Sequence, residues 1–305
     1  MGPTFLLNNS FQHLLSCGFS RRNSLLLRDV RSSSCWGSSD WSSWEWPKSR
    51  NHEEGNVSGA TGQHNKQLLI PSDMETEKAI SILMRFTSEQ RAKFLRKVLR
   101  LRTSRVRCLF ENPSNYNNVF ASLRTLDSFA IHYTDIINNT SKRGEGNSRK
   151  QSMLSSLGAV KWLSVNHHNV STKDVLTKLK YEQPELCVVV SDIHCENSQS
   201  LYDIQWTSKC PSVVVFGNEE RGVSEEVRSM ADVSFYIPMK GFAESLNLSA
   251  SVAVTCAHLD YIGVLTPNLS EREMDSILLK WLLNSVRGSE AILRRYSSSN
   301  SSNQQ

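Results

Sequence analysis

The sequence of 305 residues lacks several patterns that mark common classes of protein. Its seven cysteines form no Cys-x-x-Cys pair and no regular spacing, which disfavours a disulfide framework or a zinc site and favours reduced thiols. No run of about 18 apolar residues occurs, so no membrane-spanning helix is expected. Neither a Walker loop nor a Gly-x-Gly-x-x-Gly segment is present, so the usual routes to nucleotide binding have no support.

The first fifty residues are poor in acidic side chains, with none before Asp29, and contain twelve serines. They also carry Arg21, Arg22, Arg28 and Arg31. An Arg-rich, Ser-rich and acid-poor start is typical of a mitochondrial or chloroplast transit peptide, and we expect residues 1–71 to be a transit peptide followed by a polar linker. The alternative is a disordered extension without an address, which would leave the protein in the cytoplasm. Residues 296–305 are expected to form a disordered tail.

Between these ends, short β-rich runs alternate with stretches that have a helical pattern. The expected strands are residues 106–110, 129–137, 160–165, 186–190, 213–216 and 233–237. The expected helices are residues 75–102, 119–128, 172–180, 224–230, 245–262 and 271–286. This alternation, with strands that are apolar throughout, predicts an α/β fold with a mostly parallel sheet covered by helices. We assign the α/β domain to residues 106–295 and a basic helical extension to residues 72–105.

The helical extension carries charge of one sign only. Eight basic residues and no acidic residue lie between Arg91 and Arg107. A solvated helix normally mixes signs, so this cluster favours a polyanionic partner such as a nucleic acid over a merely exposed basic face. The candidate RNA-binding residues are Arg91, Lys93, Arg96, Lys97 and Arg100.

Three further stretches carry polar residues in loops next to strands. The first, residues 115–125, is an Asn-rich loop in which Asn118 is expected to be the N-cap of a helix that begins near Val119. Arg124 would then lie in the second helical turn. Taken alone, Asn118 is best interpreted as a cap and Arg124 as a surface charge.

The second stretch, residues 213–224, places Gly217 and Glu219 in a turn directly after a buried strand. Open α/β sheets bind ligands at this position, and glycine permits a close backbone approach. In the third stretch, residues 235–253, a strand stops at Pro238 and a helix is expected to begin near Ser245. Small residues from Ser249 to Ala253 would let another backbone pack closely; alone, they indicate no more than a packing face.

In this order, the three stretches resemble the three motifs of the SpoU/TrmH family of RNA 2′-O-methyltransferases, within the SPOUT superfamily. Motif one corresponds to residues 118–124, motif two to residues 216–222 and motif three to residues 237–249. The resemblance covers residues 87–283 and is greatest to the tRNA guanosine branch, which is similar in its basic N-terminal helix and in the pairs Lys161-Trp162 and Trp281-Leu282.

The resemblance implies a deep trefoil knot in the C-terminal half and S-adenosyl-L-methionine as the methyl donor, with no metal. Donor contacts would fall at Ser191, Gly217, Ile237 and Leu246. Arg124 would activate the ribose 2′-hydroxyl, and because an arginine is a poor base, its role is better stated as electrostatic. The remaining residues, which would order the site, are Asn118, Glu219, Ser245 and Asn247.

The resemblance also implies a homodimer in which two subunits complete each active site, with Asn118 near the partner's pocket. The expected substrate is a guanosine ribose in the D-loop of tRNA, because the short basic helix differs from the separate RNA-binding domain of ribosomal branches. Ribosomal RNA as the substrate and a non-catalytic RNA-binding assembly factor remain alternatives.

Two departures from the family stand out. Ala130-Ile131 replaces Gly-Val, which we expect to alter packing only, and the polar insert Arg143–Lys150 puts substrate contacts there in doubt.

Overall fold

A computed structural model describes residues 74–139, 158–207 and 210–301, all within one compact unit that spans residues 65–305. The expected transit peptide and linker (1–71) and the polar insert (143–150) lie outside the described residues. No helix in the described ranges is long and apolar enough to cross a membrane.

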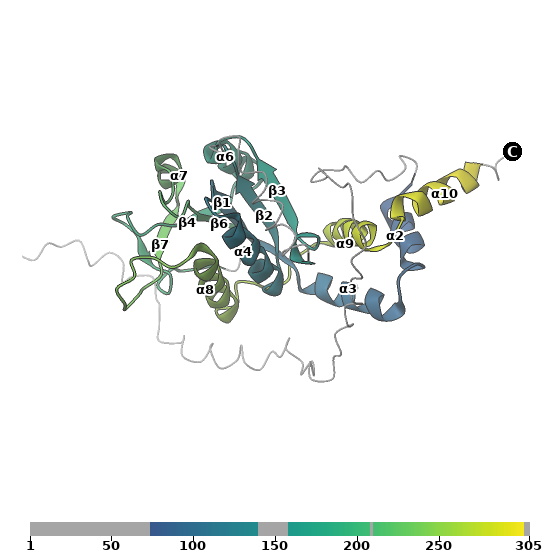
Figure 1. Cartoon of the computed structure of the whole chain (residues 1–305), viewed down its shortest axis with the longest axis horizontal. Coiled ribbons are helices and arrows are strands. Elements are labelled where there is room, and N and C mark those ends of the chain that lie inside the picture. Colours follow the sequence, from purple (N-terminus) through teal and green to yellow (C-terminus); the bar gives the residue numbers. More distant parts are fainter. Residues whose placement is uncertain (1–73, 140–157, 208–209, 302–305) are drawn as a thin grey trace, which may run out of the picture. The chain divides into compact units, whose positions relative to one another are not determined.

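A parallel sheet of seven strands confirms the expected α/β fold (Figure 1). The spatial order of the strands is β3-β2-β1-β6-β4-β7-β5, with every pair parallel. The strands are β1 (Thr103–Glu111), β2 (Ile131–Ile137), β3 (Ser164–His168), β4 (Cys187–Ser191), β5 (Gln199–Ser200), β6 (Ser212–Phe216) and β7 (Val233–Tyr236). Because the carboxyl ends of parallel strands share one edge, the loops after β1, β4, β6 and β7 meet there.

Helices cover both faces of the sheet. The helices α4 (Tyr116–Ser128) and α8 (Leu248–Tyr261) pack against each other and against the face that carries Val214 and Phe216. The helices α6 (Thr172–Glu182) and α7 (Glu225–Met230) cover the opposite face, with Val213 and Val215. Strand β6 is buried at every residue because helices cover it on both sides, which explains its continuous apolar sequence.

Two departures from the expected elements have local causes. Strand β3 begins at Ser164 instead of Val160, and its sequence is polar because it is an edge strand whose Asn166 and His168 both bind the buried Asp135 carboxylate. Ala130, which follows α4, has a φ of 60°. This left-handed conformation suits glycine and disfavours residues with a side chain. The Gly-to-Ala difference therefore changes the backbone energy, and the expectation that it affects packing alone was wrong.

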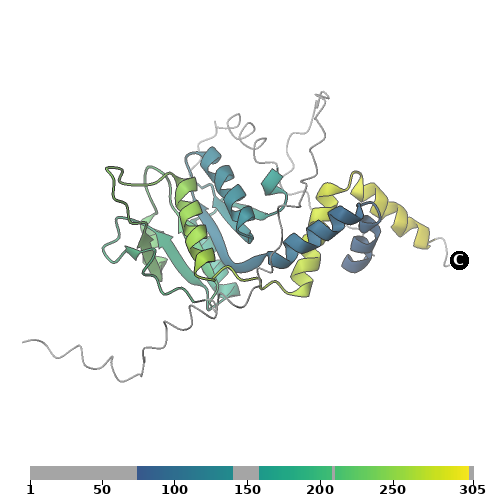
Figure 2. The ribbon, with the colours of Figure 1, turned by 90° about the horizontal axis from the view of Figure 1, so that it is seen from below.

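A second hydrophobic core joins helices from both ends of the described chain (Figure 2). The expected helix over residues 75–102 is interrupted: α2 (Thr76–Met84) ends before a turn, and the Ser88 hydroxyl caps α3 (Glu89–Leu101). These two pack with α9 (Glu271–Ser285) and α10 (Ser289–Ser301) around residues such as Leu83 and Leu282. Helix α10 was not expected, and it continues into the segment that composition predicts as a disordered tail.

The basic residues between Arg91 and Arg107 differ in their exposure. Arg102 is buried and ion-paired with Asp127, and Arg107 donates to Asp135 at 2.7 Å, so these two contribute to the fold. In contrast, four cations spaced along one side of α3 are exposed: Lys93, Arg96, Lys97 and Arg100. Arg91 is half-buried, with its guanidinium 5.1 Å from the centre of the Trp162 ring.

Candidate active site

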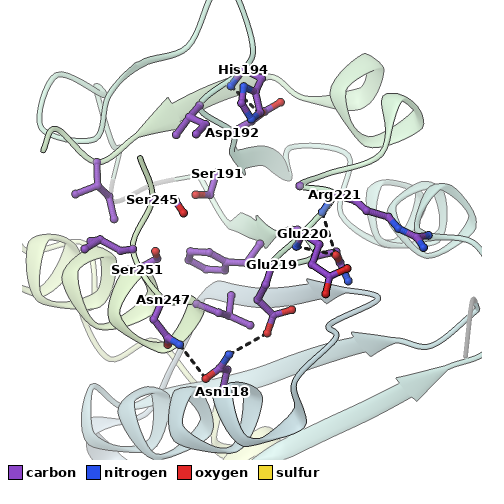
Figure 3. Close-up of a pocket in the computed structure, with 18 of the residues that line it drawn as sticks. Asn118, Ser191, Asp192, His194, Glu219, Glu220, Arg221, Ser245, Asn247 and Ser251 are labelled. Carbon is purple, nitrogen blue, oxygen red and sulfur yellow. Dashed lines mark hydrogen bonds between the residues drawn. The ribbon is translucent and has the colours of Figure 1, made fainter. Parts of the chain in front are cut away.

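A cavity of about 410 Å³ lies beyond the carboxyl ends of β4, β6 and β7 (Figure 3). Eight of the nine residues expected to bind the donor or order the chemistry line it, and Arg124 does not. The eight are Asn118, Ser191, Gly217, Glu219, Ile237, Ser245, Leu246 and Asn247. Residues from four separate loops therefore meet in one hollow, at the sheet edge where α/β proteins bind ligands.

The turn after β6 is closed tightly by its backbone. Asn218 and Gly222 exchange backbone hydrogen bonds of 3.0 and 2.9 Å, and Gly222 has a φ of 68°. A Cβ atom on Gly217 would lie 2.3 Å from the carbonyl carbon of Gly222, so no side chain fits there. Glycine at 217 is therefore required by the turn itself, and this turn lines the cavity.

Glu219, in this turn, binds the loop between β1 and α4. Its carboxylate accepts hydrogen bonds from the backbone N–H of Ser114 (2.8 Å), the Ser114 hydroxyl (2.8 Å), the N–H of Asn115 (3.3 Å) and the Asn118 amide (3.0 Å). Burial acts to raise the pKa of Glu219, but the hydrogen bonds from Asn118 and Ser114 outweigh it and hold the pKa below its ordinary value. The carboxylate is therefore ionised and committed to the loop, which suits an ordering role better than that of a base.

Asn118 and Asn247 connect this loop to the third motif. The Asn247 amide donates to the Asn118 side-chain oxygen at 3.0 Å (Figure 3). The Asn247 side-chain oxygen accepts from the N–H and the hydroxyl of Ser249. Asn247 is consequently the N-cap of α8. A continuous chain of hydrogen bonds thus links all three motif loops across the cavity mouth.

The structure corrects two local expectations for these motifs. Asn115, and not Asn118, caps α4, which begins at Tyr116; this leaves the Asn118 side chain available for Glu219. Asn118 lines the cavity of its own chain. Helix α8 begins at Leu248, so Ser245 lies in the preceding loop and is exposed.

Arg124 is exposed and stands on α4 away from the cavity. It lies in the third turn of α4, beyond the second turn that the sequence indicated. Six residues after Asn118, it is displaced by about 9 Å along the helix and by roughly 120° around it. The arginine that lines the cavity in the described part of the chain is Arg221, which sequence analysis did not single out.

Sequence analysis also missed Asp192, which follows β4 directly. Its side chain is 2% exposed, accepts from the Arg228 guanidinium at 2.6 Å and from the N–H of His194 at 3.0 Å, and fixes the loop that forms one cavity wall. The hydrogen bond that Arg228 donates to Asp192 is the main cause that raises the pKa of Arg228. A carboxylate directly after a buried strand was the available signal, but nothing in the sequence identified its partner on α7.

Comparison with known proteins shows which proteins this chain is similar to. A family model described as the SpoU rRNA Methylase family matches residues 105–257. A tRNA (guanosine(18)-2′-O)-methyltransferase of Aquifex aeolicus is 30% identical over 203 residues, which cover 65% of this chain and 91% of that protein. The enzyme of the same name from Thermus thermophilus is 30% identical over 171 residues, or 56% of this chain and 82% of that one.

The structures agree with the sequences. The crystal structure of the A. aeolicus TrmH/SpoU tRNA modifying enzyme has a TM-score of 0.53 and 29% sequence identity with this chain. The match covers 65% of this chain and 98% of the A. aeolicus chain.

Proposed function

We propose, on the premise that this chain belongs to the SpoU rRNA Methylase family, that it is an S-adenosyl-L-methionine-dependent 2′-O-methyltransferase that acts on a D-loop guanosine of tRNA, of the guanosine-18 type. The observation that carries the proposal is the chain of hydrogen bonds from Glu219 through Asn118 to Asn247, which brings the three family motifs to one cavity. The RNA class and the nucleotide are those for which the relatives are named.

The cavity fits the donor. Its volume of about 410 Å³ lies in the range of small-molecule sites, roughly 300–1,000 Å³. The backbone of Gly217 and the apolar side chains of Ile237 and Leu246 suit a nucleoside held largely by backbone groups, and Ser191 also lines the cavity. S-adenosyl-L-methionine, when bound, would supply an activated methyl group, and Gly217, Ile237 and Leu246 would hold it in the cavity.

Arg124 supports the proposal that the enzyme is a homodimer. The family role of this residue is to stabilise the developing alkoxide of the ribose, yet the side chain stands outside the cavity of its own chain. A partner subunit can supply it if α4 of one copy faces the cavity of the other. Helix α8 favours the same assembly, because Ser249, Ala250 and Ala253 are only half-buried in one chain. We extend the proposal to the trefoil knot of the family, in which the segment after β7 passes through a loop.

The exposed stripe on α3 is the proposed RNA contact. Lys93, Arg96, Lys97 and Arg100 are exposed along one side of the helix and can each neutralise a phosphate, although Lys93 already pairs with Glu89 at 2.7 Å. Arg91 lies beside Trp162 at the border of the stripe. Contacts to phosphate give affinity without sequence specificity, so the choice of nucleotide must come from the cavity region.

The direct test is to incubate the purified protein with methyl-labelled donor and total RNA, and then to locate the label. The proposal predicts label on the ribose of a D-loop guanosine in tRNA. Label on ribosomal RNA alone would show that ribosomal RNA, and not tRNA, is the substrate. Donor binding without transfer to any RNA would indicate a non-catalytic factor. Replacing Arg96, Lys97 and Arg100 with Gln should weaken tRNA binding and lower its salt slope by roughly two units, with donor affinity unchanged.

A further inference from the structure

The loop between β7 and α8 carries an aromatic side chain that the donor site does not use. Both ends of this loop line the cavity, through Ile237 and Met239 at its start and through residues 245–247 at its end. Its middle does not, and there Phe242 has a relative exposure of 109%, the highest of the large apolar side chains in the described ranges. The next most exposed is Tyr181, at 88%.

A phenylalanine held in water on a loop whose two ends line a cavity is unfavourable in the free protein, because its apolar surface remains hydrated. It becomes favourable when a partner covers the ring. The neighbouring charged side chains are Lys240 and Glu244, both exposed, so the loop offers one cation and one anion beside the ring. An aromatic side chain next to a cation is a common arrangement for single-stranded nucleic acid, with the base on the ring and the phosphate near the cation.

We propose that Phe242 stacks on an RNA base adjacent to the methylated ribose, with Lys240 directed to the backbone of the same segment. The inference rests on the proposed function, because it requires RNA at the cavity mouth. The donor is not the partner of Phe242, since the donor occupies the cavity and Phe242 does not line it. The RNA, in contrast, must pass the cavity mouth to place its ribose, and the loop that borders this mouth is covered each time it does so.

Stacking of one base on an aromatic side chain sets the expected size of the effect. Removing the ring should weaken RNA binding about 5- to 150-fold, which corresponds to about 1–3 kcal/mol. The effect should be tolerant of base identity, because every base has a flat face. Phe242 would thus help to hold the target loop open at the cavity, while the identity of the methylated nucleotide is recognised elsewhere.

The test compares Phe242→Ala, Phe242→Leu and Phe242→Trp with the unmodified protein. We measure KM for tRNA, direct binding of a D-loop RNA hairpin by fluorescence anisotropy, and donor affinity by calorimetry. Phe242→Ala should raise KM and the hairpin Kd about 5- to 150-fold, with donor affinity within about twofold. Phe242→Leu, which keeps an apolar side chain without the ring, should lose most of the same affinity, and Phe242→Trp should retain it.

Tyr181→Ala is the matched control. Tyr181 is almost as exposed, but it lies near the end of α6, which leads into the start of β4 at the sheet edge opposite the cavity. Its removal should leave every quantity unchanged.

Three results would overturn the inference. The first is an unchanged KM in Phe242→Ala while the unmodified enzyme methylates tRNA. The second is a Phe242→Ala protein that sediments as a monomer when the unmodified protein does not, because the ring would then belong to an interface between copies. The third applies if the unmodified protein methylates no RNA, in which case the proposed function fails separately. Equal affinity of Phe242→Ala and the unmodified protein for the RNA hairpin would then reject the stacking role.

Discussion

Replacing Glu219 with Gln tests whether this carboxylate orders the loop between β1 and α4. The carboxylate accepts four hydrogen bonds, two of them from Ser114. A glutamine keeps one acceptor oxygen and turns the other position into a donor. The Ser114 hydroxyl can rotate to accept from that donor, but the Ser114 backbone N–H cannot, so the hydrogen bond from this N–H is lost. The remaining hydrogen bonds become weaker because their acceptor is no longer charged.

A hydrogen bond to a charged group contributes roughly 1.5–3 kcal/mol and one between neutral groups about 1 kcal/mol. Because Glu219 is partly exposed, solvent screening reduces these values. We therefore expect the loop to lose about 2 kcal/mol of stabilisation, which corresponds to a roughly 30-fold larger population of the open loop. Hydrogen exchange at the amides of Ser114 and Asn115 should accelerate by this factor, and methyl transfer should fall with it.

Acid should reproduce part of this loss in the unmodified protein. The folded-state pKa of Glu219 is lowered, so its stabilisation is complete above the unfolded-state pKa and is lost as the pH falls through the folded-state value. The difference between the two proteins should consequently shrink at low pH. Glu220→Gln is the control, since it removes an exposed charge in the same turn. If Glu219→Gln matches this control in exchange rates and methyl transfer, the ordering role is refuted.

Four further predictions concern the partner subunit, the backbone, a buried histidine and the N-terminus. Arg124→Ala should lower methyl transfer at least about 100-fold with donor affinity unchanged. Mixing this protein with Asn247→Ala should restore activity, because one site of each mixed dimer then has both residues intact. No recovery on mixing would contradict a shared site. Ala130→Gly should raise the free energy of unfolding in urea by about 0.5–1 kcal/mol because it relieves the left-handed φ, whereas a loss of stability would show that residue 130 is not strained. Burial and the nearby Arg102 and Lys280 lower the pKa of His132 from 6.5 to about 3, so below pH 6.5 the unfolded chain binds a proton that the folded chain does not. Stability should therefore fall by up to about 1.4 kcal/mol per pH unit between these values, and a His132→Gln protein should lack this component in urea titrations. Residues 1–50 fused to a reporter should direct it to mitochondria or plastids, and a diffuse cytosolic reporter would reject that address.

Apolar pattern alone located most of the fold. Strand β6 was predicted within one residue because both of its faces are buried, so its sequence is a run of apolar side chains. Strand β3 was misplaced because an edge strand with one polar face carries no such run, and β5, with two residues, is too short for any pattern. The expected helix over residues 75–102 did not include the break between α2 and α3, although Ser88 is a residue type that commonly caps a helix.

The sequence predicted which residues form the candidate site, but not the hydrogen bonds and ion pairs between them. The motif residues were identified by their order along the chain, and eight of the nine line one cavity. No sequence pattern indicated that Glu219 binds Ser114, which lies 105 residues away, or that Asp192 pairs with Arg228. Such pairs depend on which loops the sheet order brings together, and β6 lies between β1 and β4 only in the folded protein.

The second hydrophobic core has a consequence for synthesis. Helices α2 and α3 leave the ribosome well before α9 and α10, yet Leu83 and Leu282, both fully buried, belong to the same core. Until the last helices emerge, the N-terminal pair exposes an apolar face next to a basic one, a combination prone to aggregate or to bind a chaperone. A chain that stops before α9 would keep every residue of the catalytic cavity but would never cover this face. The basic N-terminal helices can therefore become stable only after the final helices have been synthesised.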